Sequence, residues 1–141
     1  MIGFVYDDGG RADAGYRGKT GDCVIRATAI ATGLEYEKLY KKFARLNKKR
    51  YGIATGRQGV AKKDYEPVLE SLGFVKRSRQ KGSKWETFTQ AYQYYGDCII
   101  VFPHHMAAIV DGNLRDTEDW RTYEWEGEIR ERKAANIYQK M

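Results

Sequence analysis

Three side chains of this 141-residue chain are of the types that together perform nucleophilic catalysis: Cys23, His105 and Asp116. A thiolate attacks a carbonyl carbon, an imidazole accepts the thiol proton, and a carboxylate orients the imidazole. Cys23 follows Asp22, which we expect to cap a helix, and a helix N-terminus stabilises a thiolate through its free N–H groups. By position alone, Cys23 equally fits a small buried hydrophobic residue, which is a common role of cysteine.

A predicted β-hairpin places His105 close to an acidic residue. The dipeptide Asp111-Gly112 is the strongest short hairpin signal in the chain. With these two residues as the turn, Ala107 lies opposite Asp116, and His105 projects from the same face as Asp116. Diagonal neighbours of this kind are roughly 7–8 Å apart, within reach of an imidazole and a carboxylate. Glu118 would lie directly opposite His105 if the pairing extends that far, so spacing alone leaves both acids open.

Neighbouring residues fit this geometry less well. His104 precedes the strand by one more residue and would face away from Asp116, so we expect His105 to be the base. Asp119 would point to the opposite face of the sheet. A turn at Gly112-Asn113 would keep His105 and Asp116 on one face but would move them farther apart.

The elements that must position these residues are predicted from apolar periodicity, with residues 7–21 as a glycine-rich loop. The expected helices run from Asp22 to the stop at Gly33, over about 35–47, over about 65–72 with Asp64 as cap, and within 86–95. The expected strands cover 74–79, 98–102, 106–110, 113–117, 122–125 and 135–138. Helices first and an antiparallel sheet later predict an α+β fold, in a single domain over residues 1–141.

The composition fits a globular domain, with 42% hydrophobic and 13% aromatic residues. The net charge of +6 permits contact with nucleic acid or another acidic partner without requiring it. Basic and aromatic residues mix at 48–51 and at 76–85, and residues 48–60 are expected to form an exposed basic loop. Such surfaces can hold nucleic acid, but they are more often solvated helix ends and loops.

The sequence also bears on where the protein is located and on the state of its cysteines. It has no apolar run near 18 residues and no signal-peptide pattern at its start, so we expect no membrane span and a cytoplasmic location. A reducing compartment would keep Cys23 and Cys98 as free thiols, although a disulfide between them remains open. Two cysteines and two adjacent histidines do not make a four-ligand zinc set, so we expect no metal and no cofactor.

Two segments carry a resemblance to a known family. The order of a cysteine at a helix start, a histidine opening a strand and an aspartate on the next strand resembles papain-like cysteine peptidases, above all those that remove leader peptides from bacteriocins. GDCVIRATAIATG (residues 21–33) and HMAAIVDGNLRDT (105–117) also resemble a group of small proteins of phages and prophages. The resemblance implies a papain-like fold with Cys23 as nucleophile, His105 as base and Asp116 as orienting acid.

The chain departs from that family at the oxyanion site. Papain-like enzymes carry a glutamine about six residues before the nucleophile, whose amide helps to hold the oxyanion. Here that position is Arg17, and the candidate donors are Arg17, Lys19 and Thr20 beside the backbone N–H of Cys23.

We therefore expect a thiol hydrolase or acyl-transferase that acts on a peptide, isopeptide or related amide bond. Its substrate would be a protein or peptide, including a host protein if the chain is phage-encoded. One alternative is a weakly active or inactive binding protein with the same fold, and a further one is a basic nucleic-acid-binding module. The sequence does not determine the substrate or the oligomeric state.

Overall fold

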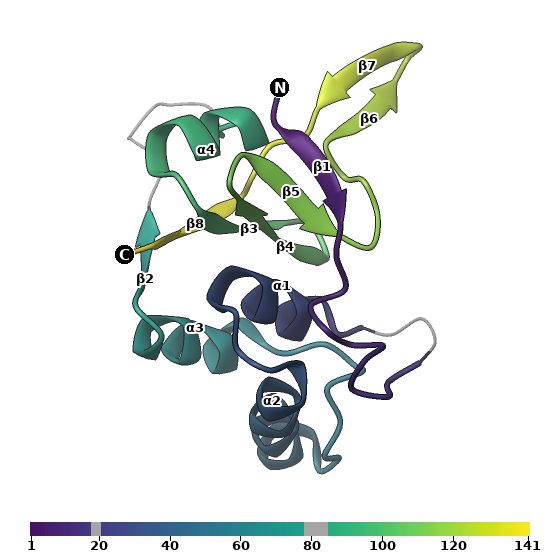
Figure 1. Ribbon diagram of the computed structural model, residues 1–141, viewed down its shortest axis with the longest axis vertical. Coiled ribbons are helices and arrows are strands. Elements are labelled where there is room, and N and C mark those ends of the chain that lie inside the picture. The colour runs from purple at the N-terminus through teal and green to yellow at the C-terminus, as the bar shows by residue number, and fades with distance from the viewer. Residues whose placement is uncertain (18–20, 78–84) are drawn as a thin grey trace.

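The computed structural model describes residues 1–17, 21–77 and 85–141, and it combines helices with a six-stranded sheet (Figure 1). The helices are α1 (Cys23–Thr32), α2 (Tyr36–Tyr51), α3 (Lys62–Ser71) and α4 (Phe88–Tyr95). The strands are β1 (Gly3–Tyr6), β2 (Phe74–Arg77), β3 (Cys98–Phe102), β4 (His105–Val110), β5 (Asn113–Asp116), β6 (Thr122–Trp125), β7 (Glu128–Glu131) and β8 (Asn136–Lys140). Within the described residues, the fold is thus a mixed one with four helices and a large, mostly antiparallel sheet.

The sheet has the strand order β1-β5-β4-β3-β8-β2, so the strands after Cys98 form its centre. Helices α1, α2 and α3 lie on one side of it, and α4 lies on the other (Figure 1). Strand β3 shows why both faces are covered: Ile99 packs with the first group of helices, whereas Cys98 and Ile100 pack in the cluster that contains Phe88 of α4. A strand whose side chains are apolar on both faces needs cover on both.

Helix α1 is buried on nearly all sides and packs closely against β4. Alanines and threonines make up half of its sequence, CVIRATAIAT, and these small side chains let the helix backbone approach the sheet. The helix ends at Gly33, which has a φ of 75° in the left-handed region that glycine adopts without steric cost. The predicted extent of this helix is therefore confirmed.

The sheet differs from the prediction at its edges. Strand β1 lies in a segment for which no strand was predicted. It pairs in parallel with β5, so the sheet is not wholly antiparallel. Strand β7 was also not predicted; it pairs with β6 in a separate two-stranded sheet. The prediction failed here because GFVY is short and lacks alternation, while EIRE is mostly charged. Residues 78 and 79 of the strand predicted at 74–79 lie outside the described part of the chain, as do residues 78–84 of the basic segment at 76–85.

Two predictions around the second and third helices are wrong. Helix α2 continues to Tyr51, so residues 48–51 are helical rather than part of a loop. Asp64 lies inside α3, whose N-cap is Ala61, and its carboxylate binds Arg50 at the end of α2 instead. The salt bridge (2.7 Å) thus replaces the expected cap.

Candidate active site

The β4–β5 hairpin sets the relation between His105 and the acids. Its register pairs Val110 with Asn113, as the Asp111-Gly112 turn predicts. Both turn residues have positive φ, 51° and 77°, which is the geometry of a type I′ turn. Beyond the paired residues, Nε2 of His105 lies 2.5 Å from Oδ2 of Asp116, whose side chain is buried. The structure therefore brings His105 together with Asp116, one of the two acids that the spacing left open and the one that the family resemblance implies.

The alternative residues lie elsewhere. Glu118 and Asp119 are exposed, and Asp119 forms an ion pair of 2.8 Å with Arg121. His104 is exposed in the turn between β3 and β4, where its φ is 63°. It nevertheless lines the same pocket as His105, which the sequence did not predict.

Cys23 begins α1 and is half-buried, at the edge of a pocket of about 250 Å³. His104 and His105 line this pocket too, and its other walls are mainly apolar, formed by Val24, Val60, Tyr65, Val101, Phe102 and Met106. The backbone N–H of Met106, the residue after His105, donates a hydrogen bond to the Cys23 sulfur. The thiol and the imidazole thus come from the start of α1 and the start of β4, and they face one cavity. Cys98 lies in the core, and both cysteines are free thiols.

The Cys23 thiol does not have the lowered pKa that a helix N-terminus alone predicts. Burial raises the pKa of Cys23, and the Met106 N–H and the Arg26 charge oppose that effect without overcoming it. Taking a sulfur out of water disfavours its anion. The thiol is therefore protonated in the resting site, and a base has to accept its proton before it can attack a carbonyl.

The Asp116 carboxyl, by contrast, is held ionised. Burial by itself would raise its pKa, but the hydrogen bond and charge of His105, the Thr117 N–H and the Arg26 charge together bring that pKa below the ordinary value of 3.8. The Thr117 N–H donates to Oδ1 at 2.7 Å, and the imidazole occupies Oδ2. Asp116 is therefore an anion placed to orient and stabilise an imidazolium.

A buried arginine joins both sides of the site and was missed by the sequence analysis. Arg26 is 5% exposed, lies one turn after Cys23 on α1, and forms ion pairs with Asp22 and with Oδ1 of Asp116 (3.2 Å). The signal for it was present, because Arg26 is the only charged residue in α1. A single arginine among small apolar residues has to be paired if that helix is buried.

Asp22 occupies the N-cap position of α1, as predicted, but its side chain does not cap the helix. Its carboxylate makes no capping hydrogen bond; it binds Arg26 and Arg11, and it accepts a hydrogen bond of 2.5 Å from the Tyr36 hydroxyl. These three partners explain the burial of Asp22, since both of its carboxylate oxygens are bound. The Asp22 carboxylate binds the Arg26 guanidinium rather than a backbone N–H group of the first turn. Arg26 lies one turn along α1, within hydrogen-bonding distance and on the buried side of the helix.

The segment before α3 completes the pocket. The Asn47 amide donates to the carbonyls of Thr55 (2.7 Å) and Gly59 (2.9 Å), and the Gly21 N–H donates to the carbonyl of Arg57 (2.8 Å). The inner end of the predicted exposed loop is thus tied to the residues before Cys23, which brings Gly59 and Val60 to the pocket wall.

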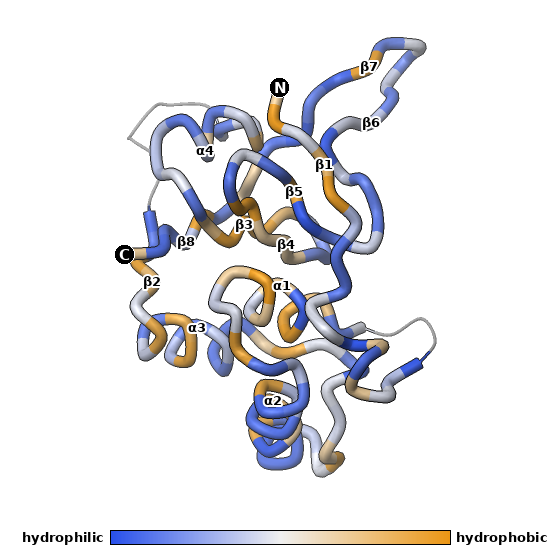
Figure 2. The backbone as a smooth tube through the Cα atoms, in the orientation of Figure 1, coloured by the Kyte–Doolittle hydropathy of each residue, from blue (hydrophilic) through white to orange (hydrophobic). Residues whose placement is uncertain are grey.

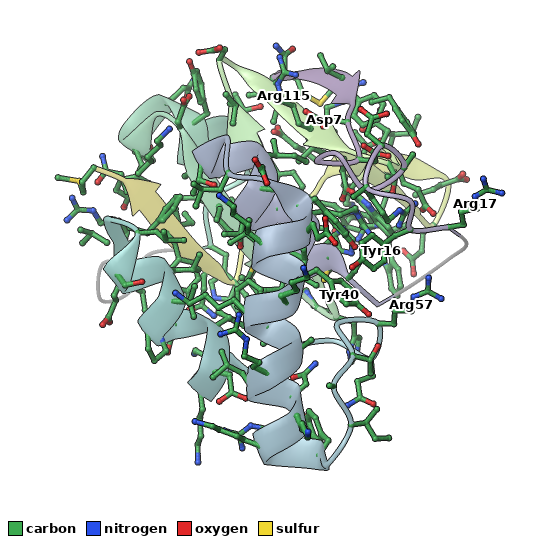
Figure 3. All side chains as sticks on the ribbon, turned by 60° about the horizontal axis from the view of Figure 1, so that its bottom comes forward. Asp7, Tyr16, Arg17, Tyr40, Arg57 and Arg115 are labelled. Carbon is green, nitrogen blue, oxygen red and sulfur yellow. The ribbon has the colours of Figure 1, made fainter. Side chains whose placement is uncertain are left out.

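Of the three side chains predicted as oxyanion donors, the structure describes only Arg17. Arg17 is exposed at the periphery, and its side chain points away from the body of the protein (Figure 3). Its carbonyl accepts a hydrogen bond of 3.2 Å from Arg57. Lys19 and Thr20 lie outside the described residues. The first turn of α1 offers backbone N–H groups instead, because the first N–H groups of any helix lack a partner within it.

The described residues contain no group of three or more His, Cys, Asp or Glu side chains arranged to hold a metal ion. None of the helices in this part of the chain is both long enough and apolar enough to cross a membrane. In comparisons with known proteins, no family model, no curated protein and no solved structure matches this chain.

Proposed function

We propose that the protein is a thiol hydrolase or acyl-transferase of the papain-like type that acts on a peptide, isopeptide or related amide bond. The observation that carries the proposal is the shared pocket of Cys23 and His105, with His105 held by a buried, ionised Asp116. Nucleophile, base and orienting acid come from three different elements of the fold, and structural packing alone does not require these three types to meet.

The proposed reaction begins with proton transfer. Asp116 holds Nε2 of His105, which leaves Nδ1 to accept the proton of the Cys23 thiol. The resulting thiolate attacks the substrate carbonyl, and the oxyanion is stabilised by N–H groups at the start of α1. The imidazolium then protonates the leaving amine, and water or another amine releases the acyl group from Cys23. No step requires a metal or an organic cofactor.

The arrangement of elements supports the papain-like assignment. In the sequence, the resemblance rests on a cysteine at a helix start, a histidine opening a strand and an aspartate on the next strand. In the fold, α1 starts at Cys23 and packs on β4, which starts at His105, and β5 ends at Asp116. The fold and the catalytic assignment are both parts of the proposal.

The experiment is active-site labelling with an electrophilic peptide probe that traps reactive cysteine thiols as thioethers or acyl adducts. We expect labelling at Cys23 in the parent protein and in the Cys98→Ala variant, which serves as the matched control, and none in Cys23→Ala. His105→Gln should lower the labelling rate by about 10²-fold or more, because the base is lost. Labelling of Cys23 that is independent of His105 would contradict the proposal and would favour a binding protein.

A further inference from the structure

The β6–β7 hairpin projects from the body of the protein (Figure 1). Two large apolar side chains near its turn are exposed. Trp125 is 55% exposed and Ile129 is 78% exposed. The turn between the strands, Glu126-Gly127, places both residues at positive φ, so the tip is a tight two-residue turn. Residues 122–131 contain four glutamates against one arginine, so the hairpin combines exposed apolar groups with negative charge.

A groove between α2 and α3 has the complementary character. It has a volume of about 390 Å³, with Leu46 and Pro67 on its apolar floor and Lys42, Arg45, Lys49 and Lys63 around it. Its one acid, Asp64, is already bound to Arg50 at 2.7 Å. Among the described residues, no carboxylate forms an ion pair with any of the four cations. Helix α2 as a whole carries five lysines and two arginines against one glutamate.

We propose that the acidic hairpin of one copy docks into the basic groove of a second copy, so that the protein associates head to tail. Trp125 would lie on the apolar floor formed by Leu46 and Pro67. Glu124 and Glu126 are its sequence neighbours and would meet cations around the groove, whereas Glu128 is paired with Arg130 within the hairpin at 3.1 Å. Burial of the indole supplies the main affinity, and the opposite charges orient the encounter.

The positions of the two surfaces determine the geometry of this contact. The hairpin lies at one end of the long axis and α2 at the other, so the hairpin of a copy does not reach its own groove (Figure 1). In the tube of Figure 2, both the hairpin and α2 combine hydrophilic with hydrophobic segments. An interface between two different surfaces is heterologous, and it produces a ring or an open filament.

A nucleic acid is the competing occupant of the groove, because four cations that pair with no carboxylate of the described residues also suit phosphates. The apolar floor favours the hairpin, since the phosphate backbone has no group to bury there. The exposed Trp125 favours it independently, because the basic groove by itself explains nothing about the hairpin; Ile129, which pairs with Glu124, projects from the other face of the hairpin.

The experiment is sedimentation velocity of the full chain over a range of concentrations, at about 0.05 M and about 0.5 M salt. We expect self-association that strengthens with concentration and weakens at high salt. The hairpin variant Trp125→Thr and the groove variant Lys42→Glu/Lys49→Glu should each weaken it by about tenfold or more. The matched control Lys38→Glu/Lys140→Glu makes the same change in net charge at residues that do not line the groove, and it should associate nearly as the parent does.

Mixing the two variants provides the sharpest test. The groove variant keeps an intact hairpin and the hairpin variant keeps an intact groove, so the mixture should form one-to-one dimers that do not grow further. A parent that stays monomeric at all concentrations, or variants that associate like the parent, would overturn the proposal. So would a monomeric parent that binds a fluorescent single-stranded oligonucleotide through Lys42 and Lys49, which would assign the groove to nucleic acid.

Discussion

The site and the outer surface hold their ion pairs in opposite environments. Asp22, Arg26 and Asp116 are 1%, 5% and 2% exposed, and they are paired with one another and with His105. The Arg121–Asp119 pair, by contrast, has side chains that are 25% and 41% exposed. Burial removes the hydration of charged groups, and their mutual attraction offsets this cost only when the geometry of the pair is good. Exposed pairs contribute little to stability.

This difference indicates what the buried charges do. A helix of small apolar residues would pack against β4 without Arg26, and apolar groups of similar volume often replace buried ion pairs with no loss of stability. The network instead connects Asp22, next to the thiol, with Asp116, which holds the imidazole. We infer that the buried charges hold the residues of the site in position, and that the exposed pairs contribute little to stability and nothing to the site. Each of the following predictions tests that contrast.

The largest effect is expected on stability. Arg26→Met leaves Asp22 and Asp116 buried without their shared cation, and it should lower the free energy of unfolding by about 3–5 kcal/mol. Arg121→Met removes the exposed pair and should change it little. Urea denaturation of both variants measures the two effects. Equal losses would show that burial of the pairs does not distinguish the two regions.

The two cysteines should differ in reactivity by on the order of tenfold or more in the folded protein. Burial raises the pKa of Cys98 to about 12, and Cys98 is 1% exposed in β3. The pKa of Cys23 is raised as well, so reaction near neutral pH requires His105 to accept its proton. Mass spectrometry of peptides labelled by iodoacetamide at about pH 6 compares the two sites. Equal labelling at Cys23 and Cys98 would contradict the proposed role of the imidazole.

Acid should weaken the fold through Asp116 more than through Asp119. The pKa of Asp116 is lower in the folded protein than in the unfolded chain, so folding is favoured by its ionised form. That contribution is complete above the ordinary pKa and is lost as the pH falls through the lower, folded-state value. The stability difference between the parent and Asp116→Asn should therefore shrink from about pH 7 to about pH 3.

Asp119→Asn provides the control for this measurement. Its pKa is also lowered, by the contact with Arg121, but its carboxylate is exposed and screened by water. The same comparison of unfolding free energies should show a shallower dependence on pH. A steeper one for Asp119 would reverse the assignment of the two acids.

Most elements were predictable, because their signals are local. The helix from Cys23 and the β4–β5 hairpin follow from apolar spacing, a glycine stop and the Asp-Gly turn, all contained within a few residues. That hairpin register also ranked Asp116 above Asp119. It left Glu118 open as well, and the choice of Asp116 over Glu118 rested on the family resemblance.

The remaining features depend on contacts between distant segments. Strand β1 exists because β5 offers it an edge, and four residues of GFVY carry no such information. Asp22 looked like a cap because capping is local, whereas its partners Arg11 and Tyr36 are brought to it by the fold. The raised pKa of Cys23 likewise comes from burial, and that is a property of packing rather than of helix position.

The smallest predicted effect concerns the orienting role of Asp116 in reactivity. Asp116→Asn should slow the alkylation of Cys23 by roughly tenfold, much less than the about 10⁴-fold loss of a serine triad, because a thiol gives up its proton far more readily than a serine hydroxyl. It should also move the onset of reactivity to higher pH. Two electrostatic effects oppose each other here: the Asp116 charge raises the thiol pKa through space, but it stabilises the imidazolium by direct contact at 2.5 Å.

The direct contact should prevail, because the attraction between charges falls with distance and Cys23 is not bonded to Asp116. The pH–alkylation profile of Cys23 in Asp116→Asn, in Asp119→Asn and in the parent decides the question. Asp119→Asn should leave the profile unchanged, since its carboxylate binds Arg121 on the surface. A downward shift in Asp116→Asn would mean that the through-space effect dominates and that Asp116 does not stabilise the imidazolium. A shift of the profile in Asp119→Asn alone would mean that Asp119, and not Asp116, orients the imidazole.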